Sequence, residues 1–384
     1  MIHLLLALLS LFVPTDSAEL VFAGDAMQHQ RQIDAARQKD GSLDYSPYFK
    51  QIEPYIQSAD FAVVNLETPL GGAPYSGYPM FCAHDNYLTA LTDAGFDLML
   101  SANNHILDRR DKGLLRTIRT FEDNSVPWLG IYRDAAHRRE VLPFIREING
   151  FRVAFLNYTY GTNGIQKRTP VEIDYIDRSL IKSDVSAARD AGAELICVCI
   201  HWGDEYKLLP NAEQKSLAKF IQGLGVEMII GSHPHVIQPM LLTDDNLLGQ
   251  PSLVVYSLGN FISAMRTTDT RGGAMVRVKL ARDAHGKAYV KGATYRMVFV
   301  EPPRNSKDNF KLVPAEAADL SPADEANRKA FTRNALRIFT THNQNVPLDS
   351  RPISDFLPRR PQGMDSIAPI PAIAVAPISA PSAN

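Results

Sequence analysis

The sequence predicts an α/β fold of mixed type, with sheets covered by helices, and three observations lead to this expectation. Short and almost uniformly apolar segments alternate with segments of helical pattern, and polar residues gather where the apolar segments end. Two further pairs of apolar segments are joined by turns. Strands that are apolar on both faces need cover on both sides of the sheet, which intervening helices provide. With 384 residues, 45% of them hydrophobic and 21% charged, the chain has ordinary globular composition and ample material for a core.

The N-terminal stretch MIHLLLALLSLFVPTDSAEL contains an apolar run. At about ten residues this run is too short to span a bilayer but suits the core of a signal peptide. Residues 16–18 supply small side chains near a cleavage point, whereas the segment before the run contains His3 and no lysine or arginine. We therefore expect residues 1–18 to be a signal peptide. The alternatives are a buried N-terminal strand or a misassigned start codon.

Strands and helices alternate after the leader. The apolar segments that we expect to be strands cover residues 19–24, 61–67, 96–102, 194–203, 227–233 and 252–261. The helices that we expect between them cover residues 86–94, 111–124, 177–191 and 211–224, and a glycine follows three of the four. This order predicts sheets with helices on their faces.

Two hairpins add antiparallel pieces to this pattern. Residues 141–159 form two alternating runs around Asn149 and Gly150, a pair of residues that suits a tight turn. Residues 272–280 and 288–300 are separated by a turn-like segment and indicate a second hairpin. The sheets are therefore expected to be mixed.

The pattern weakens beyond about residue 300. Residues 324–342 read as one amphipathic helix, and the chain from residue 359 is rich in Pro, Ala and Ser, a composition typical of disorder. We expect a signal peptide over 1–18, a main domain over 19–300, a C-terminal extension with one helix over 301–358, and a disordered tail over 359–384.

Polar side chains follow the ends of six predicted strands. They are Asp25; Asn65 and Glu67; Asn103, Asn104, His105 and Asp108; His201, with Asp204 and Glu205 after it; His233 and His235; and Asn260. The carboxyl ends of strands in α/β sheets open onto the crevice where ligands bind. Each residue has an ordinary reading by itself, such as a helix cap for Asp25 or a turn for Asn104. Six strands that each deliver such a residue favour one shared site.

The chemistry that these side chains suit is divalent metal binding. Imidazole and carboxylate groups favour Zn, Mn or Fe, and one or two ions are compatible with a carboxylate that bridges them. His233 and His235 are two residues apart, so an extended backbone would aim both rings the same way. The three cysteines form no ligand cluster, since Cys197 and Cys199 read as core residues. The formal charge of −2 gives no reason to expect nucleic acid as a partner.

The segments FAGDAM, VVNLETPL, GFDLMLSANNHILD, CIHWGDEY, IIGSHPHVIQP and VYSLGNFIS occur in this order. Together they resemble the calcineurin-like metallophosphoesterase superfamily, and more narrowly the CapA-type poly-γ-glutamate capsule biosynthesis family. The resemblance covers about residues 20–265, and we expect it to continue to residue 300. It implies a four-layer α/β/β/α sandwich of two mixed sheets, with the site on one edge.

The resemblance also implies roles for individual residues. The implied metal ligands are Asp25, Glu67 as the bridging carboxylate, Asn104, His201, His233 and His235. His105 would act as general acid or orient the leaving group. Asn65, Asn103 and Asn260 would line the pocket, and Trp202, Glu205 and Tyr206 would form its rim.

Some residues depart from the pattern of the wider superfamily. Met27 stands where that superfamily has a histidine, and His29 lies two residues too far along to replace it. The bridging carboxylate is Glu in place of Asp. These features are shared by the capsule-type proteins, and the missing imidazole predicts one tight and one loose ion, or a single ion. Arg109 and Arg110 follow the Asn-His motif and suit either an anionic substrate or solvent.

Three functions remain open from the sequence. The first is a secreted, periplasmic or envelope-bound metal-dependent hydrolase, whose metal-activated water attacks a phosphoester or a glutamyl amide of an anionic polymer. Its further partners would be membrane-bound capsule-synthesis proteins. The second is a polymer assembly or export factor that retains a metal site without catalysis. The third is a cytoplasmic phosphoesterase whose N-terminus merely resembles a leader.

Overall fold

The computed structural model describes residues 17–168, 170–244, 249–317 and 320–359. The predicted signal peptide and C-terminal tail therefore lie outside the described residues, except at their inner ends. Ser17 and Ala18, which we expected in the leader, belong to the first strand and pair with Ala281 and Leu280. None of the helices in the described part is long and apolar enough to cross a membrane.

The first sheet is mixed and contains eight strands, in the order β16-β15-β14-β1-β2-β3-β4, with β13 paired to β1. Its strands are β1 (Ser17–Ala26), β2 (Phe61–Leu66), β3 (Leu98–Leu100), β4 (Trp128–Leu129), β13 (Asn260–Ile262), β14 (Gly272–Arg282), β15 (Ala288–Glu301) and β16 (Lys311–Pro314). Strands β1 to β4 are parallel, whereas β14, β15 and β16 are antiparallel to their neighbours. The predicted second hairpin is the β14–β15 pair.

The second sheet is also mixed and has six strands, in the order β11-β12-β10-β9-β7-β6. These are β6 (Phe144–Ile148), β7 (Phe151–Thr159), β9 (Leu195–His201), β10 (Met228–Ser232), β11 (Met240–Thr243) and β12 (Ser252–Val255). The β6–β7 hairpin turns at Asn149 and Gly150, where φ is 48° and 84°. Both angles are positive, as the expected tight turn requires. Strands β5 (Ile131–Tyr132) and β8 (Glu172–Ile173) form a separate small pair.

Eight α-helices are present in the described residues. They are α1 (Gln30–Ala36), α2 (Glu53–Gln57), α3 (Asp85–Asp93), α4 (Arg110–Asp123), α5 (Ala135–Val141), α6 (Arg178–Asp190), α7 (Ala212–Gly223) and α8 (Pro322–His342). The four helices predicted between the strands correspond to α3, α4, α6 and α7, and the predicted C-terminal helix is α8. The short helices α1, α2 and α5 were not expected.

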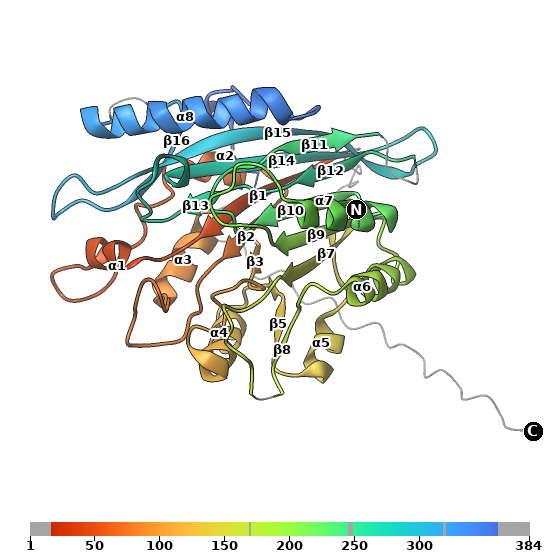
Figure 1. Cartoon of the computed structure of the whole chain (residues 1–384), viewed down its shortest axis with the longest axis horizontal. Coiled ribbons are helices and arrows are strands. Elements are labelled where there is room, and N and C mark those ends of the chain that lie inside the picture. Colours follow the sequence, from red (N-terminus) through yellow and green to blue (C-terminus); the bar gives the residue numbers. More distant parts are fainter. Residues whose placement is uncertain (1–16, 169, 245–248, 318–319, 360–384) are drawn as a thin grey trace, which may run out of the picture.

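The core has the layers of a four-layer α/β/β/α sandwich (Figure 1). Along β1, Leu20 and Phe22 point into the cluster between the two sheets, while Val21 and Ala23 point toward the helices outside. This is the alternation that a strand buried on both faces requires. A third cluster joins the far face of the second sheet to α6 and α7. The predicted fold class is therefore confirmed.

One expected strand divides between the sheets. Residues 252–261 were predicted as a single strand, but β12 belongs to the second sheet and β13 pairs with β1 in the first. The chain crosses between them at Gly259, where φ is 69°. The Gly259 carbonyl accepts a hydrogen bond from the Asp25 amide at 3.0 Å. A Cβ added to Gly24 would lie 2.0 Å from that carbonyl oxygen, so this crossing needs glycine at position 24.

Candidate metal centre

The first sheet supplies carboxylates at the ends of β1 and β2. Asp25 lies near the end of β1, Asn65 lies in β2 and Glu67 follows β2 directly. The Asn65 amide donates a hydrogen bond to Asp25 Oδ1 at 2.8 Å. All three side chains are buried, and Asp25 and Glu67 have no exposed surface. The parallel pairing of β1 and β2 places their carboxyl ends side by side, which brings these groups together.

The second sheet supplies His201 at the end of β9. Its Nδ1 atom is 2.9 Å from Ser232 Oγ, and its Nε2 atom is 3.0 Å from Asn104 Oδ1. Asn104 belongs to the loop after β3, in the other sheet. The contact between His201 and Asn104 therefore joins the carboxyl ends of the two sheets at one edge of the sandwich.

The two histidines after β10 face different parts of the site. The His233 ring lies 4.7 Å from the His201 ring, whereas His235 Nδ1 is 3.2 Å from Asp25 Oδ2 and 3.2 Å from Asn260 Oδ1. The extended backbone expected from their spacing is wrong, because φ is 99° at His233 and 58° at His235. Positive φ at non-glycine residues costs about 1–3 kcal/mol each and is typical of functional sites, where the surrounding structure holds it in place.

The donor atoms form overlapping groups. Asp25, Glu67 and His235 offer ligand atoms within 4.8 Å of one another, and so do Glu67, His201 and His233. Glu67 belongs to both groups, and each group contains one histidine of the 233–235 pair. A carboxylate shared in this way can bridge two ions or serve one ion from either side.

Several polar atoms in this cluster have no hydrogen-bond partner among the described residues, although they are buried. They are both carboxylate oxygens of Glu67, Nδ1 of His233 and Oδ1 of Asn65. Glu67 Oε1 lies 3.6 Å from His201 Nε2 and 3.8 Å from His235 Nε2, too far for hydrogen bonds. Buried polar groups are normally paired, so lone pairs left open around a shared centre fit a metal ion.

The electrostatics of the cluster also suit a cation. Burial lowers the pKa of His201 well below its usual value and lowers the pKa of His233 to about 3. Both rings are therefore neutral at pH 7, with the lone pair that a metal ligand needs. Burial, and then the negative charge of Asp25, raise the pKa of Glu67 well above its usual value. A bound cation reverses this penalty and favours the carboxylate.

His105 lies beside the cluster and is held by Asp108. Its Nδ1 atom is 2.8 Å from Asp108 Oδ2, and its ring stands edge-on to Phe81 with centroids 4.6 Å apart. A carboxylate only accepts hydrogen bonds, so the Nδ1 atom that faces Asp108 is the donor in this contact. The Phe81 amide also donates to Asp108 Oδ2, at 2.7 Å, which holds the carboxylate in place.

The remaining predicted pocket residues lie in different surroundings. Asn260 contacts His235, as described above. Asn103 is fully buried and braces the loop, since its amide donates to the Leu66 carbonyl and its Oδ1 atom accepts from the His105 amide. Trp202, expected at the rim, lies instead in the core cluster that packs against α6 and α7, and its Nε1 atom donates to the Tyr256 carbonyl.

Glu205 and Tyr206 are exposed at the edge of the cluster. Glu205 offers a carboxylate oxygen within 4.8 Å of donor atoms of His233 and His235, which makes it a further candidate ligand. Tyr206 is 55% exposed, and its ring lies 6.1 Å from the His235 ring. Both side chains line the open side of the donor cluster.

Two residues after β7 were missed in the sequence. The Tyr160 ring, 47% exposed, lies 4.6 Å from the His233 ring, and Asn163 Oδ1 accepts a hydrogen bond from Asn104 Nδ2 at 3.2 Å. β7 is parallel to β9, so its carboxyl end reaches the same edge. The rule that found the other residues would have found these, had it been applied to this strand.

Neither Met27 nor His29 replaces the histidine that the superfamily pattern has at position 27. Met27 is buried, and its carbonyl accepts hydrogen bonds from Gln32 and Tyr87. Nδ1 of His29 accepts from the Ala264 amide at 3.3 Å, and its ring packs against Phe81. His29 belongs to none of the donor groups among the described residues.

Known proteins resemble this chain in sequence. The model of the family described as bacterial capsule synthesis protein PGA_cap matches residues 19–265. The capsule biosynthesis protein CapA of Bacillus anthracis is 29% identical over 60% of this chain and 57% of its own length. The PGA biosynthesis protein CapA of Bacillus subtilis is 26% identical over 69% of this chain and 68% of its own length. The chain thus spans less than two thirds of the first of these relatives.

Solved structures with some likeness to this chain include two nucleotidases. The NAD nucleotidase of Haemophilus influenzae has a TM-score of 0.46 at 12% identity, covering 87% of this chain and 57% of its own. A putative 5'-nucleotidase of Staphylococcus aureus has a TM-score of 0.43 at 15% identity, covering 82% of this chain and 58% of its own.

Proposed function

The chain belongs to the bacterial capsule synthesis protein family PGA_cap, and from this premise we propose that it is a metal-dependent hydrolase of capsule biosynthesis. The substrate we propose is an anionic polymer, cleaved at a glutamyl amide or a phosphoester. The name of the Bacillus subtilis relative, a PGA biosynthesis protein, supports the polymer. One observation carries the hydrolase proposal: the buried Glu67 carboxylate has no hydrogen-bond partner among the described residues and shares its surroundings with three histidines.

The proposed ligands divide into two sets around Glu67. Asp25 and His235 would hold an ion on one side, and His201 and His233 on the other, with Asn104 beside His201. A bound Zn, Mn or Fe ion would supply Lewis acidity toward the scissile group and lower the pKa of a water molecule. Asn65 and Ser232 orient Asp25 and His201 by hydrogen bonds, the role that outer partners of metal ligands ordinarily have.

We assign the exchange of a proton to His105. Asp108 holds its Nδ1–H, so Nε2 can take up a proton and deliver it to a leaving amine or alcohol. This resembles the general histidine–carboxylate arrangement in which the acid orients the ring and stabilises its charged form. Asp108 is therefore a positioning residue, and His105 is the proposed general acid.

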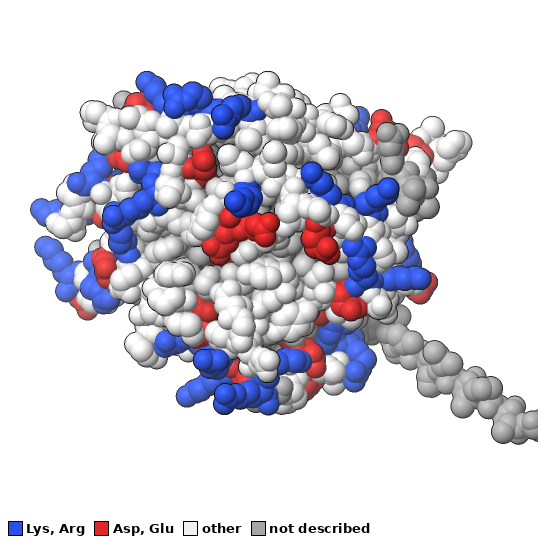
Figure 2. All heavy atoms as spheres, viewed as in Figure 1, with Lys and Arg blue, Asp and Glu red and all other residues white. Residues whose placement is uncertain are grey.

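The surface does not favour nucleic acid as a substrate. Figure 2 shows Lys and Arg side chains mainly around the periphery of this face, with Asp and Glu side chains nearer its middle. The formal charge of the whole chain is −2. A broad basic surface, which nucleic acid binding requires, is not seen on this face. We further propose a location outside the cytoplasm, which the predicted leader and the capsule family support.

The direct test is hydrolysis by the purified protein with added Mn²⁺. An aryl phosphate and a γ-glutamyl oligomer are offered in parallel, and the expected result is cleavage of at least one of them. His105→Ala should lower the rate by about 10²–10⁴-fold with metal content unchanged, whereas His235→Ala should lower both. Equal rates in the wild type and both variants would contradict the proposal.

One observation favours a second function, a polymer assembly factor without catalysis. Met27 is buried at the position where the superfamily pattern has a histidine, so His235 is the one imidazole on the Asp25 side of the donor groups. A site weakened in this way suits structural or polymer-binding use of a single ion. Metal and polymer bound by the protein without any turnover would favour this function over hydrolysis.

A further inference from the structure

A cavity lined by three arginines lies beside Asn260, at the edge of the donor cluster. Its volume is about 260 Å³. Arg31 comes from α1, Arg266 from the loop after β13, and Arg271 from the residue just before β14. Val300 and Phe310 are among the apolar residues of its wall. The cavity is therefore a basic pocket with an apolar wall, which we call the arginine pocket.

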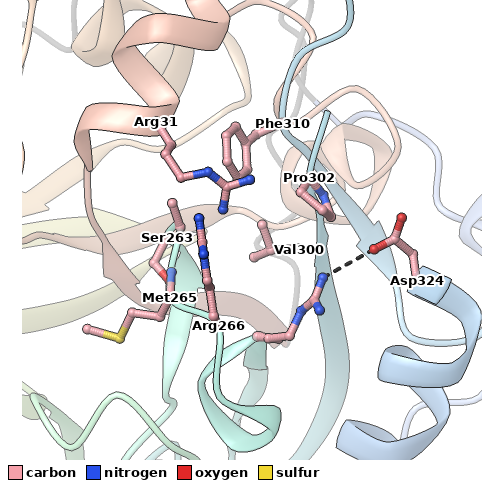
Figure 3. A pocket seen from close by; sticks show the side chains of 10 residues that line it. Arg31, Ser263, Met265, Arg266, Val300, Pro302, Phe310 and Asp324 are labelled. Atoms are coloured by element: carbon pink, nitrogen blue, oxygen red, sulfur yellow. Dashed lines mark hydrogen bonds and ion pairs between the residues drawn. The ribbon is translucent and has the colours of Figure 1, made fainter. Parts of the chain in front are cut away.

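The charges of this pocket are not balanced. Asp324 forms an ion pair with Arg271, with 3.2 Å between Oδ1 of Asp324 and a guanidinium nitrogen of Arg271. This contact is drawn dashed in Figure 3. The guanidinium groups of Arg31 and Arg266 have no hydrogen bond or ion pair with any described residue, and Figure 3 shows them pointing toward each other. Burial, and then the positive charges of Arg266 and Arg271, lower the pKa of Arg31. Two guanidinium groups that face each other without a carboxylate favour an anion between them.

The arginine pocket is connected to the metal centre by direct contacts. Met265 lines the pocket, and its sulfur lies 3.4 Å from Asn260 Nδ2. Asn260 Oδ1 in turn lies 3.2 Å from His235 Nδ1. The neighbouring Ala264, also in the pocket wall, donates its amide to His29. Two side chains, those of Met265 and Asn260, therefore lie between the pocket and His235, which makes the two sites close neighbours.

Resting on the proposed function, we infer that the arginine pocket is a subsite that holds a side-chain carboxylate of an anionic polymer while a neighbouring unit occupies the metal centre. The planar fork of each guanidinium matches the two oxygens of a carboxylate. Arg31 and Arg266 are exposed, so a polymer can enter from solvent. The Arg31 guanidinium lies over the ring of the buried Phe310 at 5.6 Å, a cation–π contact that holds this arginine at the pocket.

Binding of a γ-linked glutamate oligomer to the full chain in EDTA tests this subsite apart from hydrolysis. The double variant Arg31→Gln with Arg266→Gln should bind the oligomer at least about tenfold more weakly than the wild type, because two charge-assisted contacts are lost. Arg119→Gln, which removes an exposed arginine from α4, is the matched control and should change the affinity less than about twofold. Thermal unfolding of all variants checks that each is folded.

Two outcomes would overturn the subsite. The first is an equal affinity of the double variant and the control for the oligomer. The second is binding of inorganic phosphate, but not of the oligomer, by the wild type. Absence of hydrolysis does not affect this experiment, because it measures binding without metal. Conversely, a failed subsite leaves the hydrolysis assay with small substrates intact, so the two proposals are separable.

Discussion

Glu67 is a carboxylate with no exposed surface, and neither of its oxygens has a hydrogen-bond partner in the described part of the chain. Burial of an unpaired charge costs several kcal/mol, and proteins offset it with a partner, a metal or a proton. No arginine or lysine pairs with Glu67 among the described residues, while three histidines with donor nitrogens surround it. This residue is therefore the most direct indicator of a cation.

The Glu67→Gln variant should show separately how the buried carboxylate affects the stability of the metal-free protein and how it affects the affinity for Mn²⁺. The metal-free variant should unfold at the same temperature as the metal-free wild type or higher, since the amide carries no charge. Its affinity for Mn²⁺ should fall by about 100-fold or more, because even outer partners of metal ligands are worth 10–100-fold. Thermal unfolding with and without Mn²⁺ measures both effects.

Glu213→Gln is the control, because the Glu213 side chain is 79% exposed and belongs to none of the donor groups in the described residues. That variant should gain as much stability from Mn²⁺ as the wild type does. If Mn²⁺ stabilised Glu67→Gln equally well, the role given to Glu67 would be wrong.

His29 predicts a dependence of stability on pH. Burial lowers its pKa from about 6.5 to about 4 in the folded protein. A lowered pKa means that this group contributes stability above pH 6.5, and that the contribution is lost as the pH falls toward 4. Between these pH values the metal-free His29→Gln variant should therefore lose about 2 kcal/mol less unfolding free energy than the wild type.

Urea unfolding of the metal-free proteins at pH 6.5 and 4.5 measures this difference. His285→Gln serves as control, since His285 is exposed in the β14–β15 turn, and it should follow the wild type. Parallel loss of stability in His29→Gln and the wild type would show that His29 does not titrate as described.

At the scale of single residues, the ends of predicted strands located the candidate site correctly. The backbone conformation expected for individual residues was wrong at His233 and His235. Asp25, Glu67, Asn104 and His201 meet because parallel strands bring their carboxyl ends to one edge. The two-residue spacing of His233 and His235 suggested a shared direction, but positive φ turns them toward different neighbours. Such angles depend on tertiary contacts, and a sequence does not reveal them.

At the scale of elements, the close approach of β1 and β13 positions Asp25, the first of the proposed metal ligands. Gly24→Ala would place a Cβ 2.0 Å from the Gly259 carbonyl oxygen. This oxygen accepts a hydrogen bond from the Asp25 amide. The added Cβ and the Gly259 oxygen are both fixed by the backbone, so β1 and the segment that leads into β13 must move apart. We expect a loss of about 2–3 kcal/mol of unfolding free energy and weaker metal binding, measured by urea unfolding and by titration with Mn²⁺.

Gly292→Ala in β15 is the matched control, because nothing lies within 4 Å of a Cβ added there. It should be neutral or slightly stabilising, since alanine restricts the unfolded chain. If both substitutions had equal effects on stability and on Mn²⁺ binding, the crossing at Gly259 would not position Asp25.

The long, regular elements could be predicted, and the short or divided ones could not. Helices α3, α4, α6 and α7 have clear periodicity, and a glycine follows three of them. In contrast, α2 has five residues and β4 has two, which is too little sequence for a period to emerge. The β12–β13 segment reads as one apolar run, because burial in either sheet requires the same residue types.

At the scale of the whole molecule, the donors come from both sheets. The first sheet supplies Asp25 and Glu67, and the second supplies His201 and the pair after β10. An ion held by all of them would link the two layers that the apolar core also joins. Binding to the folded state alone stabilises that state in proportion to the logarithm of ion concentration. The domain order along the chain, including the leader and the tail, stays a prediction.

The most direct measurement is the anomalous scattering of crystals grown with Mn²⁺ or Zn²⁺. The arrangement described here predicts at least one peak about 2.0–2.3 Å from a Glu67 oxygen and from a nitrogen of His201, His233 or His235. A second peak about 3.5–4 Å from the first would show the two-ion form. An ordered site with no peak within about 5 Å of Glu67, a range well beyond any metal–ligand bond, would contradict the account.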